Sequence, residues 1–304
     1  MNAPTKVVGF VLGIAVAFVV AYAVGSQVGP VGEPAEASAH TDGGHSESGG
    51  HSDGGHASAG NAETVGLPGG LMVSEGGYTL ALQDKVSQAG RGKEISFVIE
   101  GPDGPVTAYD VLHEKRLHFI AVRRDFAGFQ HVHPKLAGDG TWTTALDLTP
   151  GQWRVLADFK PSGGEALTLG SDLSVPGRTD PATGGQTTRT ASVDGYTVEL
   201  TGDLVAGEHS MLKLQVSRDG RPVTDLQPYL GAYGHLVALR GGDLAYLHVH
   251  PDGEPGDGKT DPGPEIEFGA EVPSEGEYHL YLDFKHDGVV RTAQFQLDAK
   301  AHGE

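Results

Sequence analysis

The chain of 304 residues contains no cysteine and only three methionines. Without cysteine there can be no disulfide bond, no thiolate zinc site and no copper site that depends on a cysteine ligand. The methionines, at positions 1, 72 and 211, are too few for a thioether-rich Cu(I) site. Any metal bound by this protein is therefore expected to have imidazole and oxygen ligands.

Basic residues are also scarce. There are 21 lysines and arginines against 40 aspartates and glutamates, which gives a formal net charge of −19 with histidine neutral. The sequence has no basic stripe that could displace counterions from phosphates, so we expect no nucleic-acid partner. An acidic surface favours solubility and attracts cations, although charge alone identifies no ligand.

One long apolar run stands at the N-terminus. Lys6 precedes an uncharged segment, residues 7–25, which at ~1.5 Å rise per residue is just long enough to cross a bilayer as a helix. With residues 1–6 on the cytoplasmic side, the rest of the chain is expected outside a cell membrane crossed once. The alternative is a signal peptide cleaved near Ala21-Tyr22-Ala23, after which the protein is secreted. Both alternatives export the remainder.

Residues 26–63 show no hydrophobic periodicity and consist mostly of small, polar and acidic residues. Such a segment cannot bury enough apolar area to offset its ordering entropy, so we expect a disordered stalk. It contains four histidines spaced by five or six residues, namely His40, His45, His51 and His56. The stalk is either a low-affinity metal collector or a flexible spacer whose biased composition includes histidine.

From Gly76 onward, short β-type runs alternate with turns rich in Gly, Pro and Asp, in a chain with 47 glycines and 18 prolines. No long amphipathic helical segment interrupts them. The pattern predicts five strands in the first half, at Tyr78–Gln83, Glu94–Glu100, Leu117–Arg123, Trp142–Leu148 and Gln152–Phe159.

The second half repeats the first. The block HFIAVRRDFAGFQHVHP beginning at His118 aligns without a gap with HLVALRGGDLAYLHVHP beginning at His235, and both blocks start 13 residues after an equivalent proline. We expect an all-β protein with two tandem β-sandwich domains, residues 64–178 and 190–304, joined by a linker, residues 179–189. Immunoglobulin-like and cupredoxin-like topologies both fit this pattern.

Each copy carries three histidines at the same offsets. His131 and His133 are two residues apart on an extended segment, so both imidazoles lie on one face. A hairpin with a tight turn would bring His118 close to them, and Asp158 follows as an oxygen partner. Three imidazoles and a carboxylate suit Zn²⁺ or Cu²⁺. The predicted metal ligands are His118, His131, His133 and Asp158 in the first copy and His235, His248, His250 and Asp283 in the second.

The same histidines could instead be structural, bonded to backbone carbonyls or to the two aspartates in a buried network. Histidines without a counterpart in the other copy are expected at the surface; they are His113, His209, His279, His286 and His302. Trp153 and Tyr278, which occupy equivalent positions, are expected to pack in the cores.

The HxHP blocks FQHVHP and LAYLHVHP, each followed by DFK, resemble uncharacterised exported actinobacterial proteins with a tandem domain. They are also similar to segments found beside heavy-metal-binding domains in bacterial copper-handling proteins. The resemblance covers residues 76–298 and implies extracytoplasmic metal or copper homeostasis. FQHVHP also resembles the H-x-H strand of copper–zinc superoxide dismutases, but the histidines for a second metal are missing.

The sequence thus predicts a membrane-anchored extracytoplasmic protein that buffers or delivers Cu²⁺ or Zn²⁺ at one histidine site per repeat, with a metal-handling protein as a possible partner. The alternative is a non-catalytic cell-surface interaction module with structural histidine clusters. We expect no enzyme activity, because the sequence shows no separate general base, serine triad or phosphate loop.

Overall fold

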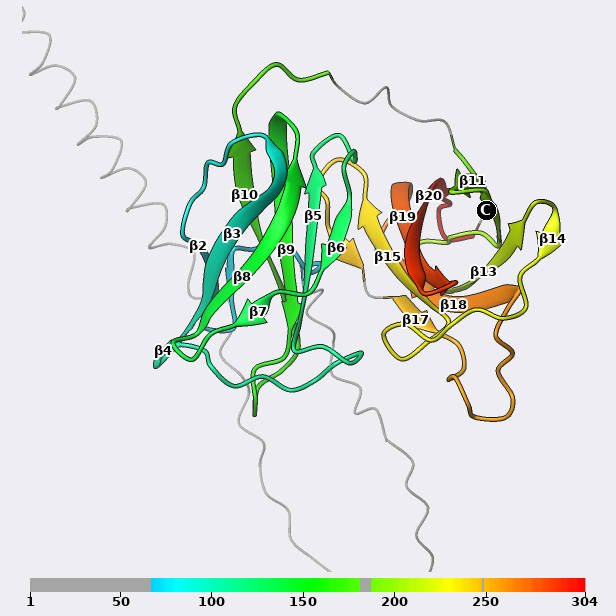
Figure 1. Ribbon diagram of the computed structural model, residues 1–304, viewed down its shortest axis with the longest axis horizontal. Coiled ribbons are helices and arrows are strands. Elements are labelled where there is room, and N and C mark those ends of the chain that lie inside the picture. Colours follow the sequence, from blue (N-terminus) through cyan, green and yellow to red (C-terminus); the bar gives the residue numbers. More distant parts are fainter. Residues whose placement is uncertain (1–66, 181–186, 248, 304) are drawn as a thin grey trace, which may run out of the picture. The chain divides into compact units, whose positions relative to one another are not determined.

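The computed structural model describes residues 67–180, 187–247 and 249–303 (Figure 1). Within these ranges every named element is a β-strand, which confirms the all-β class. In the same ranges no helix has the length and hydropathy needed to cross a membrane. The expected anchor, residues 7–25, and the expected stalk, residues 26–63, lie outside the described residues.

Repeat 1 contains ten strands. They are β1 (Ser74–Glu75), β2 (Tyr78–Leu82), β3 (Gly90–Gly101), β4 (Gly104–Pro105), β5 (Leu117–Arg123), β6 (Gln130–Val132), β7 (Lys135–Leu136), β8 (Thr141–Leu148), β9 (Gly151–Phe159) and β10 (Leu167–Val175). One sheet has the order β1-β2-β3-β8-β7, with β4 on β3, and the other has the order β10-β9-β5-β6. The five strands predicted from sequence correspond to β2, β3, β5, β8 and β9, and β5 agrees at both ends.

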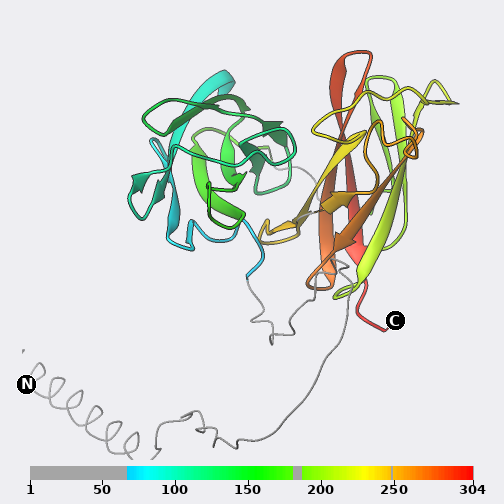
Figure 2. The same cartoon turned by 90° about the horizontal axis from the view of Figure 1, so that it is seen from below.

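Repeat 2 follows the same plan. Its strands are β11 (Thr190–Val193), β12 (Tyr196–Thr201), β13 (His209–Arg218), β14 (Arg221–Pro222), β15 (Gly234–Arg240), β16 (Tyr246–Leu247), β17 (Val249–Pro251), β18 (Glu265–Glu271), β19 (Gly276–His286) and β20 (Val289–Ala299). The two sheets have the orders β11-β12-β13-β18-β17 and β16-β15-β19-β20. Figure 2 shows β12 and β13 in a different layer from β19 and β20.

The strand order decides between the two topologies that the sequence left open. In repeat 1, β2, β3, β8 and β7 take the places of strands A, B, E and D in one sheet. In the other sheet, β5, β9 and β10 take the places of strands C, F and G. ABED packed on CFG is the immunoglobulin-like arrangement, and repeat 2 has the same order. Both domains are therefore immunoglobulin-like sandwiches.

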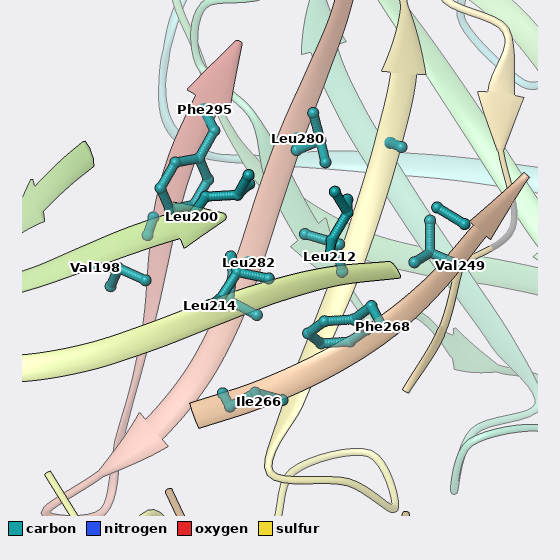
Figure 3. Packing of buried hydrophobic residues seen from close by; sticks show 14 of the residues in the cluster. Val198, Leu200, Leu212, Leu214, Val249, Ile266, Phe268, Leu280, Leu282 and Phe295 are labelled. Atoms are coloured by element: carbon teal, nitrogen blue, oxygen red, sulfur yellow. The ribbon is translucent and has the colours of Figure 1, made fainter. Parts of the chain in front are cut away.

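Each sandwich has its own apolar core, because inward-facing side chains alternate with exposed ones along the outer strands. In β13 the burial alternates regularly, so that Leu212, Leu214 and Val216 are buried. Figure 3 shows Leu212 and Leu214 facing Leu280 and Leu282 of β19 across the core of repeat 2. This alternation is what fixes the register of the sheet.

A hydrogen-bonded aromatic residue anchors the start of strand F in both repeats. The hydroxyl of Tyr278 donates to the carbonyl of Ser274 at 2.9 Å, and Nε1 of Trp153 donates to the carbonyl of Thr149 at 2.8 Å. Both aromatic side chains are fully buried, as predicted. A tyrosine bonded to the backbone a few residues upstream is the tyrosine corner of immunoglobulin-like domains, and the tryptophan does the same in repeat 1.

Candidate metal centre

The strands that carry the first histidine of each repeat are buried on both faces. Every residue of β5 is buried, and the side chains of Leu117, Phe119 and Ala121 belong to the core of repeat 1. The side chains of Ile120 and Val122 point the other way and pack against Val237 and Leu239 of β15. We call this second apolar group the interface cluster; it comprises Ile120, Val122, Phe129, Leu156, Val237, Leu239, Leu244, Tyr246 and Tyr281.

Aromatic contacts hold the interface cluster together. The rings of Phe129 and Tyr281 stack with centroids 3.8 Å apart and planes 6° from parallel. The Tyr281 hydroxyl donates to the carbonyl of Phe126 at 3.0 Å. Each contact joins one repeat to the other, so the site described next is built on two sheets that pack against each other.

The β5–β6 hairpin brings the three histidines of repeat 1 together. Strand β6 pairs antiparallel with β5, with Phe119 opposite Val132 and Ile120 opposite His131. One further step in this register places His133 opposite His118. One ring nitrogen from each of His118, His131 and His133 lies within 4.8 Å of the other two.

Hydrogen bonds determine where the protons of two of these imidazoles are. Nε2 of His118 lies 3.1 Å from the carbonyl oxygen of Leu112, which can only accept, so we assign the proton of His118 to Nε2. Nδ1 of His131 lies 2.9 Å from Oδ2 of Asp283, so we assign the proton of His131 to Nδ1. Both assignments leave a lone pair on the opposite nitrogen of the ring.

Those two lone pairs face each other. Nδ1 of His118 lies 3.0 Å from Nε2 of His131, which is hydrogen-bonding distance between two atoms that both act as acceptors in the neutral rings. Only a proton or a cation between them removes the repulsion. The two rings are also shielded from water, since His118 is 3% exposed and the side chain of His131 is 1% exposed.

Burial keeps the surrounding imidazoles neutral. Desolvation, followed by repulsion from His131, lowers the pKa of His118 to about 3. The same two causes, in the same order, lower the pKa of His133 to about 3. Nε2 of His133 is buried and has no hydrogen-bond partner. Near neutral pH these rings therefore offer lone pairs rather than positive charge, as metal binding requires.

Repeat 2 contributes directly to this site. The ring of His235 lies 4.9 Å from that of His131 and 5.5 Å from that of His118, measured between centroids. Asp283, which pairs with His235 across β15 and β19, accepts from His131 through Oδ2 and from Thr292 Oγ1 at 2.6 Å through Oδ1.

The equivalent aspartate of repeat 1 has a corresponding set of contacts. Asp158 lies opposite His118 in the register of β5 and β9. Its Oδ1 accepts from Thr168 Oγ1 at 3.0 Å, and its Oδ2 accepts from the hydroxyl of Tyr246 at 3.3 Å. Each aspartate thus bonds a threonine of its own repeat and a side chain of the other repeat. Asp158 was predicted as a ligand beside His118, but it does not belong to the group of three converging histidines.

The second set of predicted ligands is separated in the structure. His235 lies with the histidines of repeat 1, whereas His250 is exposed on β17, which pairs with β18 in the other sheet. His248 lies outside the described residues. Among the residues that the structure describes, one histidine triad is formed, and it belongs to repeat 1. The described residues thus show one buried triad in repeat 1, next to His235 and Asp283, and a separate site in repeat 2 stays a prediction.

His113 is a site residue that the sequence analysis placed at the surface. Its ring lies 6.1 Å from that of His118 and 5.9 Å from that of His235. It occupies the first central position of a two-residue turn closed by Leu112 and Lys115, with φ of 45°. Leu230, the equivalent residue of repeat 2, has a φ of 58°, so the positive φ belongs to the two-residue turn that both repeats share. The equivalent residue in repeat 2 is leucine, so the comparison of the two copies gave no reason to single it out.

Two further histidines expected at the surface are not there. His286 is buried, with Nδ1 2.7 Å from the Tyr196 hydroxyl and Nε2 2.9 Å from Asp225. His279 stacks on Phe126 with ring centroids 3.6 Å apart. Both contacts are structural, and they show that absence from one copy does not make a histidine superficial.

Comparison with solved structures gives only weak likenesses. The Escherichia coli adhesin FdeC is 14% identical, with 78% of this chain and 66% of that chain covered and a TM-score of 0.24. The Yersinia pseudotuberculosis adhesin InvE is 12% identical, with 78% and 61% covered and a TM-score of 0.23. The FN1–FN3 domains of chicken CNTN1 are 10% identical, with 77% and 69% covered and a TM-score of 0.21. This chain spans less than two thirds of both adhesin chains, and TM-scores this low carry no argument about function.

No curated protein matches the chain in sequence. One family profile, described as a domain of unknown function (DUF8832), matches residues 73–177 and again residues 191–301. The two matched ranges coincide with the two sandwiches and together make up more than half of the sequence. The chain therefore belongs to the DUF8832 family.

Proposed function

We propose that this protein binds Zn²⁺ or Cu²⁺ through His118, His131 and His133 and that it buffers or delivers the ion outside the cytoplasm. The observation that supports this most strongly is the distance of 3.0 Å between Nδ1 of His118 and Nε2 of His131, two ring nitrogens that carry lone pairs in the assigned tautomers. Zinc–nitrogen bonds of about 2.0–2.1 Å in a tetrahedral site place two ligand nitrogens about 3.3 Å apart. If the two nitrogens moved apart by a few tenths of an ångström, one ion could bind both of them and remove the repulsion between their lone pairs.

The donor set favours these two metals. Neutral imidazoles suit Zn²⁺ and Cu²⁺, whereas Mg²⁺ and Ca²⁺ prefer oxygen ligands. The carboxylate of Asp283 accepts from Nδ1 of His131 and so leaves Nε2 free to bind metal. A carboxylate in this position fixes the tautomer of a ligating histidine and increases its basicity.

The cellular role follows from the sequence around the sandwiches. The apolar run of residues 7–25 supports export and anchoring, and the histidine-rich stalk supports a collecting role close to the membrane. The similarity of the HxHP blocks to segments of copper-handling proteins supports transfer of the ion to a metal-handling partner. The proposal involves binding and release and no catalytic step.

The alternative, a surface interaction module, requires an apolar patch open to a partner. The interface cluster supplies apolar and aromatic side chains on one sheet of each repeat, including Phe129 and Tyr281. In the described part of the chain these two patches cover each other, and both side chains are less than 10% exposed. The interface cluster therefore favours a fixed pairing of the two repeats, which suits a buried centre better than recruitment of a separate partner.

The test is a titration of the exported part of the chain with Zn²⁺ and Cu²⁺ after removal of metal by a chelator. To remove the contribution of the stalk, serine replaces His40, His45, His51 and His56 in all samples. The decisive variant combines His131→Ala with His133→Ala. Its matched control combines His209→Ala with His302→Ala, because both control side chains are more than 60% exposed.

We expect tight binding of one ion by the parent chain and by the control, and its loss in the His131→Ala/His133→Ala variant. The circular dichroism of the variant should still show the β structure of the parent. If the parent binds no ion, or if the decisive variant binds as tightly as the control, the proposed function is wrong.

A further inference from the structure

The imidazole of His235 borders the triad, outside the group of ring nitrogens that lie within 4.8 Å of one another. A zinc–nitrogen bond of about 2.0–2.1 Å puts the centre of an imidazole ring about 3.2 Å from the metal, so rings at two corners of a tetrahedron have centres about 5 Å apart. The three rings of the triad are separated by 5.2 Å (His118 to His131), 5.1 Å (His118 to His133) and 4.9 Å (His131 to His133).

His235 continues this spacing from the other repeat. Its ring centroid lies 4.9 Å from that of His131, a separation that the triad itself shows, and 5.5 Å from that of His118, which is slightly longer than any separation within the triad. Its ring is nearly parallel to that of His118, at 5°.

Asp283 reaches the same site from the strand beside His235. It lies opposite His235 in the β15–β19 pair, and its Oδ2 accepts from Nδ1 of His131 at 2.9 Å. One strand pair of repeat 2 thus supplies both an imidazole and the carboxylate that orients a ligand of repeat 1. The second oxygen of Asp283 is held by Thr292, which fixes the carboxylate in this position.

From this placement we infer that the centre is shared: His235 of repeat 2 is the fourth ligand of the ion bound by His118, His131 and His133, and Asp283 is the positioning residue that orients His131. This inference rests on the proposed function and extends it. Because ligands come from both repeats, the bound ion ties the two sandwiches together. Binding of the ion and docking of the repeats must then strengthen each other by the same factor.

The arrangement also explains why the interface cluster lies beside the histidines. Apolar packing of Ile120 and Val122 against Val237 and Leu239 holds β5 and β15 together before any ion arrives. The ligands are therefore largely assembled in advance, and little ordering entropy remains to be lost on binding. Four imidazoles would close a tetrahedral site, which is typical of storage and of structural sites rather than of catalysis.

The inference is tested in the exported chain with serine at the four stalk positions, using Zn²⁺ for affinity and Co²⁺ as a spectroscopic probe. Tetrahedral Co²⁺ absorbs visible light far more strongly than octahedral Co²⁺, so its spectrum reports the number of ligands. The variants are His235→Ala, His235→Gln and Asp283→Asn. His250→Ala, on exposed β17 of the same repeat, is the matched control.

We expect His235→Ala and His235→Gln to weaken Zn²⁺ binding at least about 10–100-fold and to change the Co²⁺ spectrum, because a ligand is lost. Asp283→Asn should weaken Zn²⁺ binding about 10–100-fold and preserve the four-coordinate Co²⁺ spectrum, as expected for a residue that acts through a ligand. His250→Ala should change neither measurement. The glutamine variant keeps the test valid if the alanine variant fails to fold.

Two results separate failure of this inference from failure of the proposed function. In the first result, the parent binds Zn²⁺ and the His131→Ala/His133→Ala variant does not, but both His235 variants retain the affinity and the Co²⁺ spectrum of the parent. The centre then belongs to repeat 1 alone, and the inference is wrong. If the parent itself does not bind Zn²⁺, the proposed function fails and the inference fails with it.

Discussion

Nδ1 of His131 in the first repeat lies 2.9 Å from Oδ2 of Asp283 in the second, and both side chains are almost completely buried. These two residues do not occupy equivalent positions in the two copies, because the counterpart of Asp283 is Asp158. The contact joins the second repeat directly to the histidine triad of the first.

Asp283→Ala should destabilise the metal-free protein by about 2–5 kcal/mol, because it removes the acceptor of two buried donors, Thr292 Oγ1 and His131 Nδ1. Urea unfolding in the presence of a chelator measures the difference. The control is Asp243→Ala, which breaks an ion pair with Arg240 at a carboxylate 39% exposed and should cost less than about 1 kcal/mol. Equal costs for both variants would contradict this account of the Asp283 contact.

Zn²⁺ should raise the free energy of unfolding. At a free ion concentration of 100 times Kd, a site present only in the folded protein adds about 2.7 kcal/mol. Urea unfolding with and without Zn²⁺ should show this gain in the parent and none in His131→Ala/His133→Ala. A gain of the same size in the variant would place the stabilising ion elsewhere.

The ion should also restrict the motion of one repeat against the other. Because the chain has no cysteine, Ala145→Cys on β8 and Glu199→Cys on β12, both exposed, allow two spin labels to be attached cleanly. Pulsed electron paramagnetic resonance should give a distance distribution that narrows when Zn²⁺ is added. The narrowing should disappear in His235→Ala. A distance distribution whose width does not change when Zn²⁺ is added to the parent would argue against a shared centre.

Stability of the metal-free protein should fall as the pH is lowered from about 6.5 towards 3. The pKa values of His118 and His133 are lowered to about 3 in the folded protein, whereas an unfolded histidine titrates near 6.5. The unfolded state therefore binds more protons within this window, so each histidine favours unfolding by up to about 1.4 kcal/mol per pH unit. Above pH 6.5 this contribution to stability is complete.

The measurement is a series of urea unfolding curves between pH 7.5 and 4 in the presence of a chelator. The double variant His118→Gln/His133→Gln should show a flatter dependence on pH than the parent, because neither glutamine titrates. If the free energy of unfolding varied with pH in the same way in both proteins, His118 and His133 would not be the source of the pH dependence.

Local sequence patterns and the internal repeat were sufficient to predict two all-β sandwiches, but not their immunoglobulin-like topology. The run from Leu117 to Arg123 predicted both ends of β5 correctly, and the internal repeat predicted two copies of one sandwich. The spacing of His118, His131 and His133 predicted a hairpin that brings them together, which the β5–β6 register provides. These features depend on residues close in sequence, where alternation and turn chemistry determine the structure.

The joint site depends on contacts between the repeats, which no local pattern encodes. The one available indication was the absence of polar alternation in HFIAV and HLVAL, since a strand that is apolar on both sides is covered on both faces. His250 shows a second limit. The motif HVHP is identical in both copies, yet Val249–Pro251 pairs with β18, whereas Gln130–Val132 pairs with β5. Two sheet edges compete for the HVHP segment, and the motif itself does not indicate which sheet the segment joins.

The most direct test of the metal centre is a crystal structure of residues 26–304 grown with one equivalent of Zn²⁺, with anomalous diffraction recorded on both sides of the zinc absorption edge. The account predicts a single strong anomalous peak about 2.0–2.1 Å from one nitrogen each of His118, His131 and His133, with Asp283 still bonded to Nδ1 of His131. A dominant peak at His250, or no peak among these three imidazoles, would contradict it.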